Sequence, residues 1–151
     1  MTRIDSHALQ ELRRELFGQN SVMPELYLDV LYSCVEGAEA TFGQQIPPGT
    51  RRTQAFWLKG HVLGQLTCEG ESDQRAEIAG RLYRLSDPVT AELGVRMNYG
   101  DFDRVVRWWG RILTLQVLDA ESVVIDATQG DEGLRRQGEQ FIDKVLAKIT
   151  G

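Results

Sequence analysis

Four glycines in the middle of the chain constrain its fold more than any other feature. They are Gly64, Gly80, Gly94 and Gly110. The midpoints of successive pairs fall at Ser72, Asp87 and Phe102, inside clusters rich in turn-forming Gly, Pro, Asp and Ser. Turns at those points would align the glycines across an antiparallel meander, where glycine marks a bend or a close backbone approach. The spacing therefore predicts one strongly curved antiparallel sheet within 53–127.

The strand-like runs of this segment alternate apolar and polar residues, as half-buried strands do. The alternation is clearest in 89–98, where the face of the odd residues, Leu93 among them, is expected to be buried and the other face exposed to water. Runs are expected at 54–58, 61–69, 76–85, 89–98, 104–118 and 123–127. Apolar residues take even positions as far as Leu82 and odd positions from Val89 onwards. Because a shift of one residue turns every side chain to the opposite face, a β-bulge or a one-residue offset is expected near Asp87-Pro88.

Helical patterns precede the sheet. The segment 5–17 places leucines on one helical face, with Asp5 or Ser6 available as N-cap and Gly18 as the stop. A second helix is expected next, from Pro24 to Gly43, with apolar residues as far as Phe42 at helical spacing. Its first part, 25–35, is dense in Tyr, Val and Leu and also fits a strand.

A C-terminal amphipathic helix is expected over 131–150, with Asp131 as its N-cap. Its apolar stripe must cover another surface, and the sheet is the one available. The sequence thus predicts a single α+β domain, 1–151. Two helices lie within 1–43, a strongly curved antiparallel meander of five or six strands lies within 53–127, and the C-terminal helix packs on the sheet.

Composition narrows the class of protein. A chain of 151 residues with 42% hydrophobic and 26% charged residues fits one globular domain. No apolar run approaches the roughly 20 residues that cross a bilayer, so no membrane contact is expected and the cytoplasm is the default location. The net charge of −5 disfavours nucleic acid as a partner. Cys34 and Cys68 lack the spacing of a disulfide framework or a zinc site and are expected to be buried small side chains.

Motifs for catalysis are missing from the sequence. Glycine patterns that cradle phosphates, HExxH and GxSxG do not occur. Asp101 and Asp103 supply only two carboxylates, which suits a turn better than a cation site, and His7 is expected to be solvated. No catalytic residue, metal ligand or cofactor is therefore assigned, and an enzyme is disfavoured.

The most unusual composition in the chain is a cluster of arginines and tryptophans. The candidate binding residues are Arg104, Arg107, Trp108, Trp109 and Arg111. The segment 101–109 fits a helix as well as a strand, and the β-propensity of its Val and Trp residues favours the strand. In a strand, Trp108 lies on the opposite face from its neighbours and near Arg96, where stacking would be structural. Such residues also suit a protein or ligand contact, or base stacking.

Two functions from different classes follow from these features. The first is a non-enzymatic protein-interaction module: an adaptor, a chaperone-like partner or a small acidic inhibitor that binds another protein or itself as a homodimer. The alternative is a small-molecule-binding domain or enzyme with a pocket between the curved sheet and the C-terminal helix, near His61, Arg81 and Tyr83. The missing catalytic motifs, the acidic charge and the Trp/Arg cluster favour the first.

Overall fold

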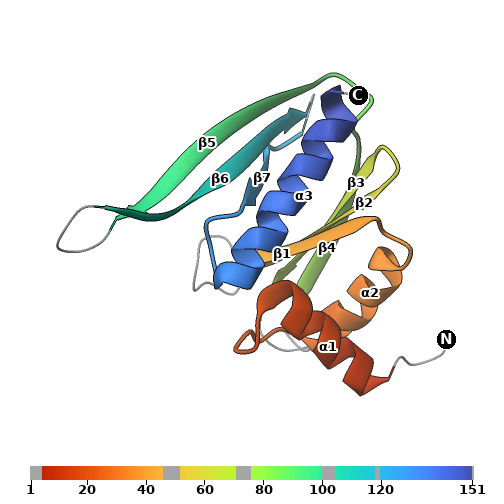
Figure 1. Ribbon diagram of the computed structural model, residues 1–151. Coiled ribbons are helices and arrows are strands. Elements are labelled where there is room, and N and C mark those ends of the chain that lie inside the picture. The colour runs from red at the N-terminus through yellow and green to blue at the C-terminus, as the bar shows by residue number, and fades with distance from the viewer. Residues whose placement is uncertain (1–4, 46–51, 71–75, 100–104, 118–119, 151) are drawn as a thin grey trace. The chain divides into compact units, whose positions relative to one another are not determined.

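The protein has the predicted α+β fold, with helices at both ends and antiparallel sheets between them (Figure 1). The computed structural model describes residues 5–45, 52–70, 76–99, 105–117 and 120–150. The chain divides into two compact units, Met1–Arg84 and Leu85–Gly151, and each contains its own sheet.

The first unit contains two helices followed by a four-stranded antiparallel sheet of order β1-β2-β3-β4. Its elements are α1 (Ser6–Phe17), α2 (Glu25–Val35), β1 (Ala40–Gln45), β2 (Arg52–Lys59), β3 (Val62–Glu69) and β4 (Glu77–Arg84). The Asp5 side chain caps α1 by accepting a 3.2 Å hydrogen bond from the main-chain N–H of His7. Gly18 ends the helix with a φ of 95°. The N-cap at Asp5 and the end of α1 at Gly18 are thus confirmed.

α2 confirms that 25–35 is a helix rather than a strand, but the prediction that this helix continues to Gly43 is wrong. Gly37 has a φ of 78°, which few other residues adopt, and the chain turns out of the helix there. The next residues form β1, where Phe42 is buried and pairs with Phe56 of β2. Pairing in the sheet therefore overrides the helical spacing of Phe42.

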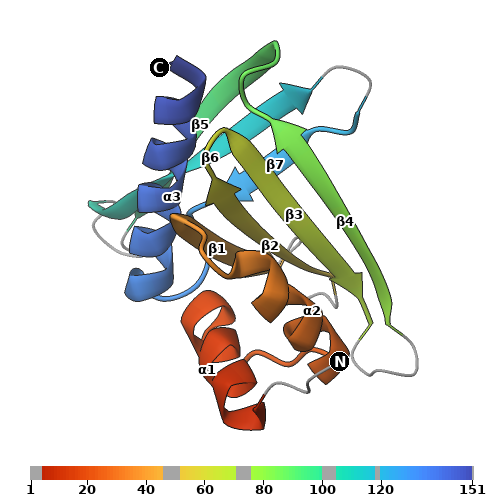
Figure 2. The same ribbon diagram turned by 90° about the vertical axis from the view of Figure 1, so that its right-hand side faces the viewer.

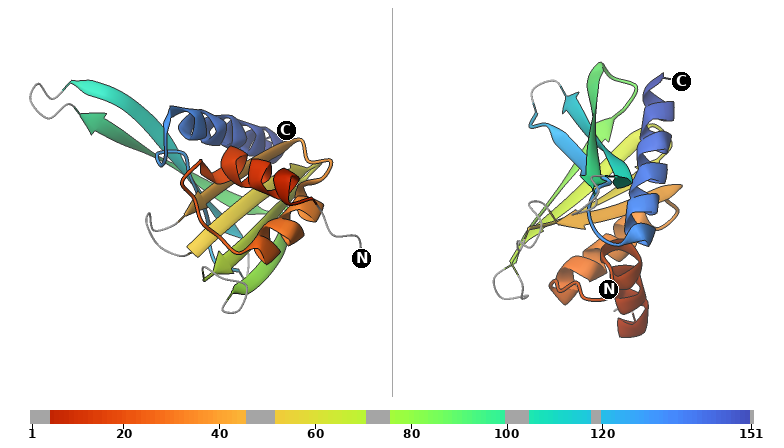
Figure 3. Two further views of the ribbon diagram at one scale, coloured as in Figure 1. Left: turned by 90° about the horizontal axis from the view of Figure 1, so that it is seen from below. Right: turned by 60° about the vertical axis from the view of Figure 1, so that its left-hand side comes forward.

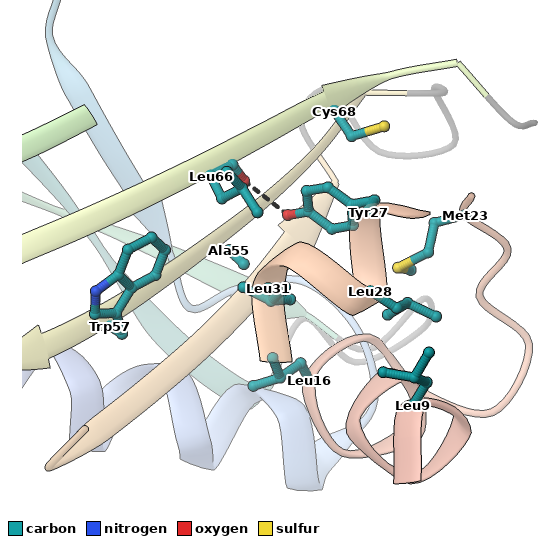
Figure 4. Packing of buried hydrophobic residues seen from close by; sticks show 10 residues of the cluster. All are labelled: Leu9, Leu16, Met23, Tyr27, Leu28, Leu31, Ala55, Trp57, Leu66 and Cys68. Atoms are coloured by element: carbon teal, nitrogen blue, oxygen red, sulfur yellow. Dashed lines mark hydrogen bonds between the residues drawn. The ribbon is translucent and has the colours of Figure 1, made fainter. Parts of the chain in front are cut away.

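Both helices of this unit lie on one face of its sheet (Figure 2). They share a buried cluster with β2 and β3 (Figure 4). The cluster consists of Leu9, Leu16, Met23, Tyr27, Leu28, Leu31, Ala55, Trp57, Leu66 and Cys68. Cys68 is fully buried, as predicted, and Cys34 packs against the cluster while partly exposed. Burial of this apolar surface is the main stabilising contribution to the unit.

β2 is buried on both of its faces. Trp57 faces the helices, whereas Phe56 and Leu58 point to the other side and are also fully buried. On that second face the buried Gln44 Nε2 donates a 3.0 Å hydrogen bond to Gln54 Oε1. Each glutamine thus has a hydrogen-bond partner inside the unit, as buried polar groups require.

The second unit contains a three-stranded antiparallel sheet of order β5-β6-β7 and one long helix. Its elements are β5 (Val89–Tyr99), β6 (Val106–Val117), β7 (Val123–Asp126) and α3 (Glu132–Thr150). Asp131 caps α3 as predicted, because its Oδ1 accepts a 2.9 Å hydrogen bond from the Leu134 N–H. α3 packs on β6 and β7 and buries Phe141 and Val145, while the β5–β6 hairpin extends beyond the helix (Figure 3).

The glycines do not form the predicted ladder. Gly64 pairs with Leu82, and Gly94 pairs with Ile112, so each hairpin lies two residues away from the predicted register. The expected single meander is also wrong, because β4 and β5 belong to different sheets. The change of apolar parity near Asp87-Pro88 marks this passage between sheets rather than a bulge, and neither sheet is strongly curled.

Two of these glycines have a packing role across the face of a sheet. A Cβ on Gly64 would collide with the indole ring of Trp57. A Cβ on Gly110 would lie 3.1 Å from the Ala127 carbonyl oxygen, where the chain leaves β7 and crosses β6. Close approach, and not lateral alignment of the glycines, explains these two positions.

Some predicted features lie outside the described residues. They are the connector at 46–51, most of the turn at 70–73, and the turn at 100–103 with Asp101 and Asp103.

Tyr27 provides a test of the first unit's core. It is fully buried, and its hydroxyl donates a 2.7 Å hydrogen bond to the main-chain carbonyl of Leu66 in β3 (Figure 4). We expect Tyr27→Phe to lower the free energy of unfolding by about 1–2 kcal/mol, because a buried carbonyl loses its donor. Urea unfolding followed by circular dichroism measures this, with the partly buried Tyr32→Phe as the control. Equal losses in the two variants would contradict the assignment.

The same residue predicts a pH dependence. Burial raises the pKa of Tyr27 well above its ordinary value, and the neighbouring Cys68 and Cys34 add to the shift. The folded state therefore keeps the phenol proton where the unfolded state releases it, so this contribution to stability is present below about pH 10 and is lost as pH rises further. We expect the stability difference between the wild type and Tyr27→Phe to narrow above that pH in urea titrations. A stability difference that stays constant above pH 10 would contradict the raised pKa of Tyr27.

Candidate functional site

The predicted Trp/Arg cluster lies on β6, so the alternative of a helix over 101–109 is wrong where the structure describes this segment, from Val105 onwards. Arg104 lies outside the described residues. Arg107, which is exposed, is the extra residue of a β-bulge: Asn98 pairs with Trp108, and Tyr99 pairs with Val106. The remaining members of the cluster have three different environments.

Arg111 joins β6 to α3. Its Nε lies 2.5 Å from Glu139 Oε2, and one terminal nitrogen lies 2.6 Å from Asp143 Oδ1. Its side chain is only 20% exposed. Burial alone lowers the pKa of Arg111, but the hydrogen bonds and charges of Asp143 and Glu139 outweigh it and raise that pKa above its ordinary value. The guanidinium is therefore a charged structural link between strand and helix.

Glu139 also completes the main-chain hydrogen bonding of β6. The carbonyl of Arg111 accepts a 3.0 Å bond from the N–H of Ala127, one residue past the end of β7. The N–H of Arg111 lies on the same side and donates a 2.7 Å bond to Glu139 Oε1. The carboxylate thus takes the place that a strand carbonyl would occupy, which satisfies a main-chain donor at the edge of the ladder.

Trp108 is partly buried and packs within the unit. The guanidinium carbon of Arg135, in the first turns of α3, lies 4.3 Å from the centroid of its ring. This distance is typical of a cation–π contact. The cation over the indole is thus Arg135, whereas Arg96, the partner expected from sequence, lies opposite Gly110 in the ladder.

Trp109 is exposed and belongs to an apolar surface that extends across β5. We define the β5 apolar face as Leu93, Val95, Met97, Tyr99 and Trp109. Alternation places the odd residues of β5 on one face, and Trp109 lies opposite Met97 in the ladder. The five side chains are between 49% and 59% exposed. Large apolar side chains that are about half exposed therefore lie next to one another on this face.

The position of α3 explains why this face stays open. Arg111 lies on the same face, and α3 packs on β6 and β7 beside it. A helix is about 10 Å wide and strands lie about 4.8 Å apart, so one helix covers about two strands. The alternation of 89–98 predicted a buried apolar face for this strand, and that prediction is wrong because the unit's single described helix stops short of β5.

The residues of the alternative pocket have separate surroundings. His61 is exposed in the turn between β2 and β3, beside Gly60, which has a φ of 58°. Arg81 is exposed on β4, opposite Gln65. Tyr83 is buried, and its hydroxyl donates a 3.0 Å hydrogen bond to Gln65 Oε1. The structure therefore gives Tyr83 a packing role in the first sheet.

Neither a metal site nor a membrane-spanning helix occurs within the described ranges. Within 5–45, 52–70, 76–99, 105–117 and 120–150, no group of three or more His, Cys, Asp or Glu side chains could hold a metal ion. Among the same residues, no helix is long and apolar enough to cross a membrane. His7 is exposed, as predicted, and its Nε2 lies 3.1 Å from Glu11 Oε1.

Comparisons with protein-family models, with curated proteins and with solved structures each gave no significant match.

The Arg111 link predicts a clear difference between two glutamates of α3. Glu139→Ala should lower the free energy of unfolding by about 2–3 kcal/mol, because it removes one of the two carboxylates that bind the Arg111 guanidinium and leaves the Arg111 main-chain N–H without its acceptor. Glu132→Ala is the matched control, since Glu132 pairs with Arg136 on the exposed side of the same helix. Glu132→Ala should lower the free energy of unfolding much less. Urea unfolding of both variants measures the difference, and losses of equal size would contradict the structural role of Arg111.

Proposed function

We propose that this protein is a non-enzymatic protein-interaction module whose binding element is the β5–β6 hairpin. The observation that carries the proposal is the β5 apolar face, five large side chains that are about half exposed and lie on adjacent strands. Contiguous apolar surface of this kind is costly to leave in water, and on natural proteins it marks a place where another surface binds.

The composition of the face supports a protein partner. Tyr, Trp and Met are enriched at protein interfaces, and tryptophan is among the residues whose loss costs the most binding energy. Trp109 and Tyr99 are the aromatic members, and the Tyr99 hydroxyl contacts the Met97 sulfur at 3.7 Å. Two aromatic side chains that each neighbour a flexible thioether are well suited to contact another protein.

The strand itself offers a second means of recognition. β5 is an edge strand of 11 residues, so among the described strands of this sheet one row of its main-chain N–H and C=O groups has no neighbour. Exposed edges of this length pair readily with an added strand. The side chains of that strand would then contact the β5 apolar face, which gives specificity. The apolar face and the open edge lie on the same element, which supports a common use.

The structure offers less support for the alternative of a small-molecule-binding domain. Its candidates were His61, Arg81 and Tyr83, and the hydroxyl of Tyr83 is engaged by Gln65. The interaction module is therefore the function that we propose.

Trp109→Ser tests the proposal. Wild-type protein immobilised in native lysate should retain a partner, which is then identified and titrated against both forms. The variant should bind it at least about tenfold more weakly, because a central tryptophan is lost from the interface. Thermal unfolding should change little, since Trp109 is exposed. Leu82→Ser, an exposed apolar residue of β4, is the control and should bind normally. A partner retained equally by the Trp109 variant would contradict the proposed surface.

A further inference from the structure

We propose that the occupant of the β5 edge is a second copy of this chain, paired antiparallel with β5 in a two-fold register centred on Gly94. This inference rests on the proposed function and names the partner of the same strand. It follows from the direction of the main-chain groups, the length of β5, the position of its two charges and the surroundings of Gly94.

The ladder shows which residues of β5 point outward. Arg111 directs its carbonyl and N–H to the β7 side, as their bonds to Ala127 and Glu139 show. Main-chain groups alternate in direction along an antiparallel strand, so those of Ile112 point to β5, and those of Gly94, its partner, point back. The odd residues of β5, such as Val95, therefore present their N–H and C=O groups at the open edge.

This alternation limits how two copies can pair. Odd residues must lie opposite odd residues, so the two-fold axis has to pass through a residue and not between two. β5 runs from Val89 to Tyr99, and its central residue is Gly94. A register centred there pairs the whole strand with its copy and leaves no unpaired end. Val89 then lies opposite Tyr99 of the second copy.

The charges of β5 select the same register. The charged residues of the strand are Glu92 and Arg96, which lie two positions on either side of Gly94. Centring on Gly94 places Glu92 of each copy directly opposite Arg96 of the other, which forms two cross-strand ion pairs. A shift of the axis by one residue places both charges opposite neutral residues. Opposite charges directly across a ladder stabilise it.

The charges of Glu92 and Arg96 are not paired among the described residues. In the part of the chain that the structure describes, neither Glu92 nor Arg96 forms an ion pair. In β6, Glu92 lies opposite Thr114, and Arg96 lies opposite Gly110. Glu92 and Arg96 are even residues, so at the new interface they form pairs without direct main-chain hydrogen bonds between the two residues. In pairs of this type the side chains lie closer together.

The described residues of its own chain give no packing reason for a glycine at position 94. A Cβ there would meet nothing closer than the Ile112 carbonyl oxygen at 4.0 Å, and its φ is not positive. Glycine in a strand weakens it unless another backbone approaches closely. In the proposed register the two copies of Gly94 face each other across the axis, in the pair with the shortest Cα separation.

The two-fold axis lies perpendicular to the sheet, so the odd residues of both strands share one face. Leu93 then lies opposite Val95 of the second copy, and Ala91 opposite Met97. Apolar pairs of this kind stabilise antiparallel ladders. The two apolar faces thus join into one, and the three strands of each copy form a continuous sheet.

Sedimentation of wild-type protein should give a dimer, with twice the mass of the 17.0 kDa chain. Glu92→Arg and Arg96→Glu should each raise the dimer dissociation constant at least about tenfold, because both ion pairs become repulsive. The double variant restores opposite charges and should return to the wild-type constant. An equimolar mixture of the two single variants should form a heterodimer, since a strand with two arginines then faces a strand with two glutamates and both cross-strand pairs are attractive.

Glu77→Arg makes the same charge change on β4 of the other sheet and should leave the dimer intact. A wild-type protein that stays monomeric at high concentration would overturn the proposal. A dimer whose dissociation constant is unchanged by both charge reversals would also overturn it. The same holds for a double variant that dimerises as weakly as the single variants.

A disulfide test gives an independent answer about register, in a Cys34→Ala background. Gly94→Cys should cross-link to its own copy under mild oxidation, because the two positions face each other across the axis. Ala91→Cys should not cross-link, since its copy is six positions away along the ladder, roughly 20 Å. Cross-linking of Ala91→Cys in place of Gly94→Cys would overturn this register.

The outcomes separate the two proposals. A monomer that still captures another protein through Trp109 would overturn the second-copy inference and leave the interaction module standing. A monomer whose Trp109→Ser variant captures the same partners would overturn both.

Discussion

The contact between Arg111 and Glu139 determines how the second unit is covered. The carboxylate binds both the guanidinium and the main-chain N–H of Arg111, so it holds α3 at a fixed place along β6. Charge-assisted hydrogen bonds of this kind are among the strongest in proteins, and here they act where burial limits competition from water. Because the helix is held over β6 and β7, β5 is left with an apolar face in contact with solvent.

The first unit covers its sheet and satisfies its buried polar groups in a different way. Its central strand β2 is buried on both faces, and its polar groups are satisfied within the unit, as in the pair Gln44–Gln54 and the bond from Tyr27 to Leu66. A strand covered in this way contributes to stability and offers little to a partner. This contrast between β2 and β5 is why we assign the proposed function to the strand whose apolar face is exposed.

Local signals were sufficient to predict the helices and most strands. Asp5 and Gly18 delimit α1, and Asp131 begins α3, because capping depends on neighbours in sequence. Periodicity shows which residues share a face, but it does not show which sheet a strand joins or what covers that face. The same limit explains the site: Trp109 was found from composition, whereas Leu93 was assigned to a core and Arg111 to a binding surface.

The bond from the Arg111 N–H to Glu139 has a consequence for the size of any assembly. A sheet with two extendable edges can add copies without end, which is the route to fibres. On the β7 side this sheet offers a strand of four residues, and a helix side chain occupies the next main-chain donor. Growth of this sheet is therefore confined to the β5 edge. The isologous pairing that we propose would occupy that edge, and the assembly would then close at two copies.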